Sequence, residues 1–178
     1  RQGTRCAALV GAHGSGKTTL FESLLHAAGS TDRRGTLKER NTVGDAAPEA
    51  RLRGISTEMS AAACRFMDDD WVLIDCPGSV EFSHEAACAL AVADIAVVVC
   101  DPDPARALAA AQLLRALDEA KLPHIVFINR IDTLGGRVRD TLAALQAHST
   151  APLVLRQVPI RTPGSDGADA VTGYVDVV

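Results

Sequence analysis

Apolar runs of strand length alternate with longer helix-like stretches along most of this 178-residue chain. The pattern predicts the strands 5–12, 58–67, 71–76, 95–101, 124–129 and 151–160, and the helices 17–28, 81–91, 104–120 and 136–148. The strands are rich in Val and Ile without strict alternation, which is typical of a parallel sheet covered on both faces. Three aspartates at 68–70 suit a tight hairpin that adds one antiparallel edge strand. The predicted fold class is α/β, with a mostly parallel sheet between helical layers.

Two segments do not fit this alternation. Residues 29–57 are polar, contain glycines and lack a clear period, and loops of that length in a compact domain are usually functional or disordered. The segment from Arg161 onward has turn residues followed by a short strand-like end. We expect it to lead toward another module rather than to finish the domain.

Composition and charge narrow the function classes. The chain is 47% hydrophobic, and its length suits one domain with a sizeable core. Its 18 Lys and Arg residues against 22 Asp and Glu residues give no electrostatic signal for nucleic-acid or membrane binding. Because it has no apolar run of membrane-spanning length and no secretion signal, a soluble, cytoplasmic protein is expected. We also expect it to be a monomer. The five cysteines form no CxxC pair, which indicates reduced core thiols, with a zinc site as the functional alternative.

Residues 11–18, GAHGSGKT, match the phosphate-binding pattern GxxxxGK(S/T) in full, between a predicted strand and a predicted helix. Glycines let the backbone wrap closely enough for successive N–H groups to point at an anion, at the positive end of the helix. We expect Lys17 to reach the β- and γ-phosphates of a nucleotide and the Thr18 hydroxyl to bind Mg²⁺. The residues expected to form this phosphate cradle are Gly11, Ala12, His13, Gly14, Ser15, Gly16, Lys17, Thr18 and Thr19.

The segment WVLIDCPGS places Asp75 at the end of a buried strand, and a Pro-Gly pair follows two residues later. A carboxylate there can hold Mg²⁺ through water, and the Gly78 N–H can approach a γ-phosphate because no side chain blocks it. DxPG alone is a weak motif that also suits an ordinary exit from a strand. Its position after a P-loop and a hairpin makes it specific.

A third polar segment, NRID, follows the strand HIVFI and contains Asn129, Arg130 and Asp132. Asp132 can accept hydrogen bonds from N1–H and the exocyclic amine of guanine, two donors that adenine does not present in that geometry. Asn129 can serve the base and also tie this loop back to the P-loop. A polar turn without a ligand is the alternative interpretation; if the clamp is real, the nucleotide is GTP rather than ATP.

With these residues, the sequence resembles the GTP-binding domain of translational GTPases, and within them elongation factor G. The resemblance rests on GAHGSGKTTL, RGIS, DCPGSVEF, NRID and the late QVPIRTPGSDGADAVTGYVDVV. It implies a three-layer P-loop GTPase fold, GTP or GDP with Mg²⁺ as ligands and the ribosome as partner. It also implies that 29–57 is the first switch and that 161–178 begins an inserted subdomain, so that 1–160 is the GTP-binding domain.

The sequence departs from this family at three functional positions. Ser56 stands where the family has a Thr that helps to hold Mg²⁺ with Thr18 and Asp75, and it keeps the hydroxyl. Ser79, which follows Gly78, stands where the family has the His that positions the attacking water, so slow or absent hydrolysis is expected. Arg130 replaces the usual Lys, and its planar guanidinium can still cover the base.

Two histidines could take over the role of the missing group. The imidazole of His13 titrates near neutral pH, but the plainer interpretation is that it faces solvent or a switch segment. Nothing in the sequence orients His84 toward the site.

The family's last base-contacting loop and closing helix are not found before residue 178, so the chain is expected to be the front part of a longer protein. Three functions stay open: a GTPase module acting on the ribosome, a GTP-dependent docking module without useful catalysis, and an ATP-dependent kinase or ATPase. Ser79 favours the second, and NRID argues against the third.

Overall fold

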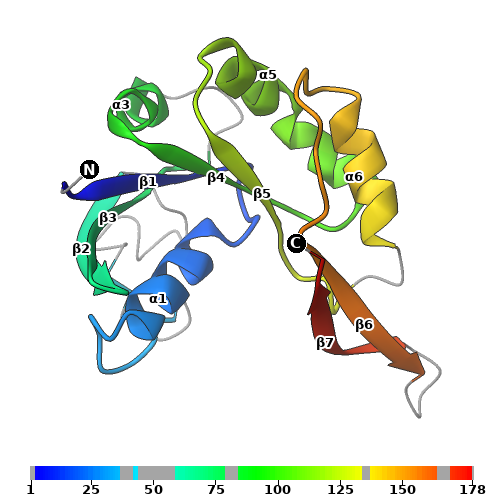
Figure 1. Ribbon diagram of the computed structural model, residues 1–178, viewed down its shortest axis with the longest axis horizontal. Helices are drawn as coiled ribbons and strands as arrows, with labels where there is room; N and C mark the ends of the chain where they lie inside the picture. The colour runs from blue at the N-terminus through cyan, green and yellow to red at the C-terminus, as the bar shows by residue number, and fades with distance from the viewer. Residues whose placement is uncertain are drawn as a thin grey trace.

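A five-stranded sheet in the order β2-β3-β1-β4-β5 forms the centre of the computed structural model (Figure 1). The structure describes residues 3–36, 42–43, 59–78, 84–133, 137–163 and 169–177. The strands of this sheet are β1 (Arg5–Val10), β2 (Ser60–Phe66), β3 (Asp69–Asp75), β4 (Ile95–Cys100) and β5 (His124–Ile128). The pairs β1–β3, β1–β4 and β4–β5 are parallel, and β2 pairs with β3 antiparallel. The predicted α/β class with one antiparallel edge strand is confirmed.

Helices cover both faces of this sheet. Figure 1 shows α1 on one face and α3, α5 and α6 on the other. The helices are α1 (Lys17–Ala27), α3 (His84–Val92), α4 (Pro104–Ala107), α5 (Ala111–Glu119) and α6 (Val138–Gln146), with a 3₁₀ turn, η1 (Leu108–Ala110), between α4 and α5. In the described ranges, no helix is long and apolar enough to cross a membrane.

Two apolar clusters, one on each face, explain why the central strands do not alternate between apolar and polar residues. On one face, Leu9 of β1 and Val99 of β4 pack with Phe21 and Leu25 of α1. On the other face, neighbouring residues of the same strands pack with Leu114, Leu117 and Leu145 of the helical layer. Successive side chains of a strand point to opposite faces, so a strand buried on both sides must be apolar throughout.

The β2–β3 hairpin turns one residue earlier than the aspartates suggest. Met67 and Asp68 have φ values of 50° and 64°, and Asp69 and Asp70 already belong to β3. Positive φ at both central residues suits a two-residue turn whose twist matches that of the flanking strands.

The strand expected over 151–160 is not part of the main sheet, and this expectation is wrong. Residues 151–156 form no strand; β6 (Gln157–Pro163) instead pairs antiparallel with β7 (Asp169–Asp176) in a separate two-stranded sheet. Val154 is 78% exposed, so the apolar run does not enter the core as a whole. The domain boundary expected between residues 160 and 161 falls within β6 and stays a prediction.

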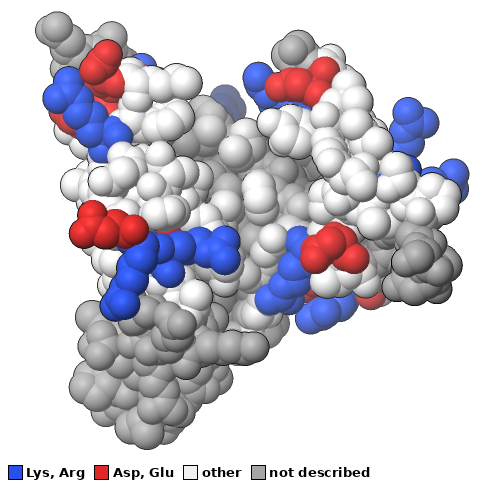
Figure 2. All heavy atoms as spheres, turned by 90° about the horizontal axis from the view of Figure 1, so that it is seen from below, with Lys and Arg blue, Asp and Glu red and all other residues white. Residues whose placement is uncertain are grey.

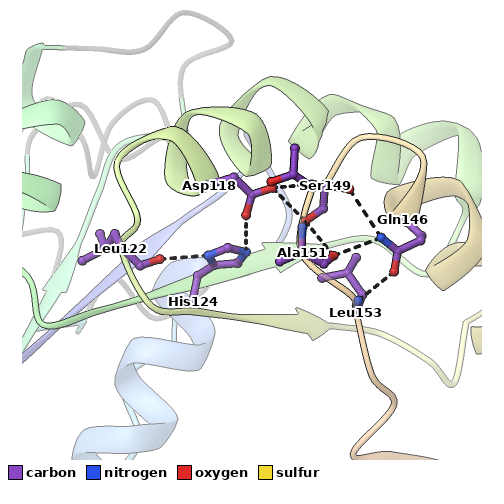
Figure 3. A network of polar contacts seen from close by, with 8 residues as sticks. Asp118, Leu122, His124, Gln146, Ser149, Ala151 and Leu153 are labelled. Carbon is purple, nitrogen blue, oxygen red and sulfur yellow. Dashed lines mark hydrogen bonds and ion pairs between the residues drawn. The ribbon is translucent and has the colours of Figure 1, made fainter.

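A side-chain network explains how residues 149–153 are held without a strand partner (Figure 3). Asp118 Oδ2 accepts hydrogen bonds from the Ser149 hydroxyl at 2.9 Å and the Thr150 N–H at 2.7 Å. Gln146 accepts from the Leu153 N–H at 2.7 Å and donates to the Ala151 carbonyl at 3.0 Å. These bonds replace a strand ladder. Burial raises the pKa of Asp118, but the bonds from Thr150 and Ser149 and the charge of His124 outweigh it and leave that pKa below its ordinary value.

The packing of α1 gives a matched test of the core. Leu25 is 1% exposed and its neighbour Leu24 is 37% exposed. We expect Leu25→Ala to lower the free energy of unfolding by about 2–5 kcal/mol, because it leaves a cavity between α1 and the sheet. Leu24→Ala should lower it by about 0.5 kcal/mol or less. Urea unfolding of both variants checks this, and equal losses would contradict the packing described.

Candidate functional site

The candidate site lies at the carboxyl ends of the parallel strands. β1 lies between β3 and β4, so the chain leaves β1 where the strand order reverses, which is where open α/β sheets bind ligands. Residues 11–16 form the turn between β1 and α1, and 17–19 open the helix. Figure 2, which views the molecule from the side of α1 and the β6–β7 hairpin, shows Lys and Arg side chains on both sides of a hollow in this face.

Lys17 is a buried cation enclosed by its own loop. It is 6% exposed, and its Nζ donates to the Gly11 carbonyl at 3.0 Å and the Ala12 carbonyl at 2.9 Å. Burial holds the pKa of Lys17 below its ordinary value, although the charge of Asp75 acts in the opposite direction. Because two of its hydrogen bonds go to neutral carbonyls, an anion in the cradle would stabilise its charged form.

Ser15 also fits a phosphate ligand. It is 1% exposed, and its Oγ has no hydrogen-bond partner in the part of the chain that the structure describes. Buried hydroxyls normally have a partner, and phosphate oxygens can supply one. His13 and Gly14 are exposed, and Thr19 is exposed on the first turn of α1. The exposure of His13 agrees with its plainer interpretation.

Thr18 and Asp75 join the P-loop to the end of β3. The Thr18 hydroxyl donates to Asp75 Oδ2 at 2.6 Å, and the two residues are 8% and 2% exposed. Hydroxyl and carboxylate oxygens are the ligands that Mg²⁺ prefers, and it is often bound by one or two protein groups plus phosphates and water. These two residues therefore fit a Mg²⁺ ion that is held together with a nucleotide.

A metal site made by protein side chains alone finds no support in the described ranges. No group of three or more His, Cys, Asp or Glu residues there could hold a metal ion. All five cysteines are free thiols, and burial raises the pKa of Cys76 and Cys100 to about 12. Those two cysteines are therefore uncharged core residues at neutral pH.

Gly78 lies directly against the P-loop. A Cβ at this position would come within 2.5 Å of Lys17 Nζ and 2.7 Å of His13 Cα. The lysine tip could move, but the loop backbone could not move without disturbing the cradle. Only a glycine allows the DxPG segment this approach. Ser79, the next residue, and Ser56 lie outside the described residues.

The segment after β5 contacts the same loop from another side. Asn129 Nδ2 donates to the Ser15 carbonyl at 2.9 Å, and Asn129 Oδ1 accepts from the Arg130 N–H at 2.9 Å. A Cβ on Gly16 would collide with the Asn129 amide, and Gly16 also has a φ of 97°. Asp132 is exposed, so its carboxylate is open to a ligand.

The chain matches a known family along most of its length. The family model described as the Elongation factor Tu GTP binding domain matches residues 2–165. The chain belongs to this family. Its membership implies guanine-nucleotide binding, and its relatives identify it as a G domain of the elongation factor G-like translational GTPases, which confirms the resemblance found in the sequence.

Several longer relatives resemble the chain in sequence. An elongation factor G-like protein of Synechocystis sp. is 41% identical over 98% of this chain and 25% of its own length. Elongation factor G 2 of Streptomyces coelicolor is 34% identical over 92% of this chain and 23% of its own. The mitochondrial ribosome-releasing factor 2 of Danio rerio is 32% identical over 92% of this chain and 21% of its own length.

A crystal structure from Thermus thermophilus supports the same fold. The superposition has a TM-score of 0.84 at 30% sequence identity, and it covers 98% of this chain and 25% of the Thermus thermophilus chain. The chain thus spans about a quarter of the length of the relatives it matches.

Three residues of this G domain that sequence patterns did not single out contact functional segments. Asp101, at the end of β4, lies 3.9 Å from Arg130 Nη1 and 3.4 Å from Arg106 Nη2. Asp101 is a carboxylate at the end of an apolar strand, like Asp75, and this sequence pattern could have identified it. Glu22 of α1 is 1% exposed and accepts from the Val43 N–H at 2.6 Å, which attaches part of the 29–57 segment to α1. The third, Arg161, contacts the NRID loop.

The close approach of Gly78 can be tested through stability. We expect Gly78→Ala to lower the free energy of unfolding by about 1–3 kcal/mol, because the new methyl group overlaps the His13 backbone. Gly173→Ala is the control, since a Cβ there would lie 3.7 Å from Ile160 Cδ1, an ordinary contact. Chemical denaturation measures both variants, and a neutral Gly78→Ala would show that the P-loop does not contact this segment so closely.

Proposed function

We propose that the chain binds GTP and GDP with Mg²⁺ as the G domain of a longer elongation factor G-like protein that acts on the ribosome. The observation that carries the proposal is the hydrogen bond from Asn129 to the Ser15 carbonyl. It joins the NRID loop to the phosphate cradle, so that one ligand with a base and a phosphate chain could contact both. The ribosome is proposed because relatives are elongation factors G and a ribosome-releasing factor.

Guanine recognition is assigned to the NRID loop. The exposed Asp132 carboxylate accepts from N1–H and the exocyclic amine, and adenine presents no such pair. Asn129 supports the loop through its bonds to the Ser15 carbonyl and the Arg130 N–H. The Arg130 guanidinium, 43% exposed in its side chain and close to Asp101, covers the face of the base.

Phosphate binding is assigned to the P-loop and the DxPG segment. Lys17 neutralises the β- and γ-phosphates, and the Gly78 backbone N–H senses whether the third phosphate is present. Thr18, Asp75 and Ser56 hold Mg²⁺, which would neutralise phosphate charge when bound. In this arrangement the protein contributes binding and orientation: the Lys17 ammonium is held by the P-loop carbonyls, and the Thr18 hydroxyl is held by Asp75.

Nucleotide selectivity is the first test. A fluorescent GDP bound to the chain with Mg²⁺ should be displaced by GTP and not by ATP. Asp132→Asn should weaken GDP binding by about 10- to 100-fold, since it removes an ionised hydrogen-bond acceptor, and should improve binding of xanthosine diphosphate. Asp68→Asn, at a side chain 99% exposed on the β2–β3 turn, is the matched control and should change neither affinity. Displacement by ATP would overturn the guanine assignment.

A second candidate function, GTP-dependent docking without useful catalysis, is favoured by Ser79. A seryl group is shorter than imidazole and is a poor base at neutral pH, so hydrolysis by the family's usual route should be slow. We expect Ser79→His in the parent protein to raise ribosome-stimulated GTP turnover at least about tenfold, because positioned acid–base groups contribute factors of this size or more.

Phosphate release with and without ribosomes measures the effect. Ser79→Ala is the control and should turn over GTP at the slow rate of the natural protein. Unchanged turnover in Ser79→His, with GDP affinity preserved, would contradict the role given to this position.

A further inference from the structure

The β6–β7 hairpin contacts the NRID loop through Arg161. The Arg161 guanidinium, on β6, donates from Nη2 to the Ile131 carbonyl at 2.8 Å. Ile131 lies between Arg130 and Asp132, the residues assigned to the base. Figure 1 shows the hairpin next to the end of β5, from which this loop departs. A second sheet, separate from the main one, therefore reaches the base-binding side of the site.

A β-bulge lies at the position from which Arg161 extends. Ile160 is opposite Gly173, whereas Arg161 is opposite Val171, so Thr172 is an extra residue on β7. Bulges redirect side chains and increase the local twist of a hairpin. The pairing continues on both sides of the bulge, from Gln157 to Pro163 on β6, so the strand that carries Arg161 is held firmly.

The NRID loop needs such support because its backbone is strained. Arg130 has a φ of 53°, a conformation that side-chain-bearing residues rarely adopt. The Thr133 hydroxyl and N–H both donate to the Arg130 carbonyl, at 2.8 and 3.0 Å, and Asn129 binds the P-loop. These bonds hold the loop at residues 129 and 130. The bond from Arg161 holds the carbonyl of Ile131, the residue immediately before Asp132.

We propose that Arg161 is a positioning residue for guanine recognition, which fixes the peptide before Asp132 and so couples the β6–β7 hairpin to base affinity. The inference rests on the proposed role of Asp132. A guanidinium suits this task because it is always charged, and hydrogen bonds from charged donors are stronger than neutral ones. Without this guanidinium, the Asp132 carboxylate should spend less time in the orientation that accepts from both donors of guanine.

The test compares ligands that use different parts of the site. GDP offers Asp132 two donors, inosine diphosphate offers only N1–H, and tripolyphosphate offers none. Arg161→Met keeps much of the stem and removes the donors. We expect it to weaken GDP binding about five- to tenfold, to reduce the ratio of GDP to inosine diphosphate affinity and to leave tripolyphosphate affinity unchanged. Arg161→Lys, which keeps a cationic donor, should restore most of the ratio.

Arg156→Met is the matched control, because it removes an Arg that is 70% exposed near the other end of the hairpin. It should bind all three ligands as the natural chain does. If Arg161→Met leaves the ratio of GDP affinity to inosine diphosphate affinity unchanged, the positioning role is overturned. An equal loss of tripolyphosphate affinity would also overturn it, because it would indicate a general structural effect. If Arg161→Met does not fold, Arg161→Leu, which also removes every N–H donor of the side chain, is read by the same ratio.

Asp132→Asn separates this inference from the proposed function. If Asp132→Asn binds GDP as tightly as the natural chain, the guanine assignment itself fails. If it abolishes guanine preference while Arg161→Met keeps the natural ratio, only the role of Arg161 fails.

Discussion

The site depends on the parallel pairing of β1 with a strand on each side. In this register Leu9 is opposite Asp75, and Val10 is opposite Val98. The Cys76 N–H extends the β1–β3 ladder by donating to the Leu9 carbonyl at 3.1 Å. Parallel strands end at the same edge: β1 ends at Val10 and β3 at Asp75, one register position apart, so the P-loop and Asp75 lie close together. The 2.6 Å bond between Thr18 and Asp75 follows from that register.

Charge burial is the second constraint. Lys17, Asp75 and Glu22 are all nearly buried in a small domain, and ionised groups are stable there only when they are paired or hydrogen-bonded. Their partners come mostly from loops: P-loop carbonyls for Lys17 and the Val43 N–H for Glu22. The strength of these interactions therefore depends on the conformation of the loops that a nucleotide would contact.

The two sheets have different roles. The main sheet places the three strand-end segments, and its central strands are apolar because both faces are covered. The β6–β7 hairpin contributes little to that core: Ile160, Tyr174 and Val175 are 44%, 64% and 49% exposed. It nevertheless reaches the NRID loop through the long side chain of Arg161. The hairpin thus contacts the NRID loop although it adds little to the core.

The sequence by itself determined the element order, the fold class, the P-loop and the family, because hydrophobic period and motif spacing are local properties. Only the tertiary structure decided which distant groups meet. Asn129 and the Ser15 carbonyl are 114 residues apart, and no local pattern pairs them. The segment 151–156 has an apolar composition suited to a strand, but its Ala151 and Leu153 N–H groups are held by the side chains of Ser149 and Gln146 rather than by a sheet. Whether an apolar run becomes a strand depends on an available partner edge, and the bulge that directs Arg161 depends on cross-strand register; neither is encoded within one segment.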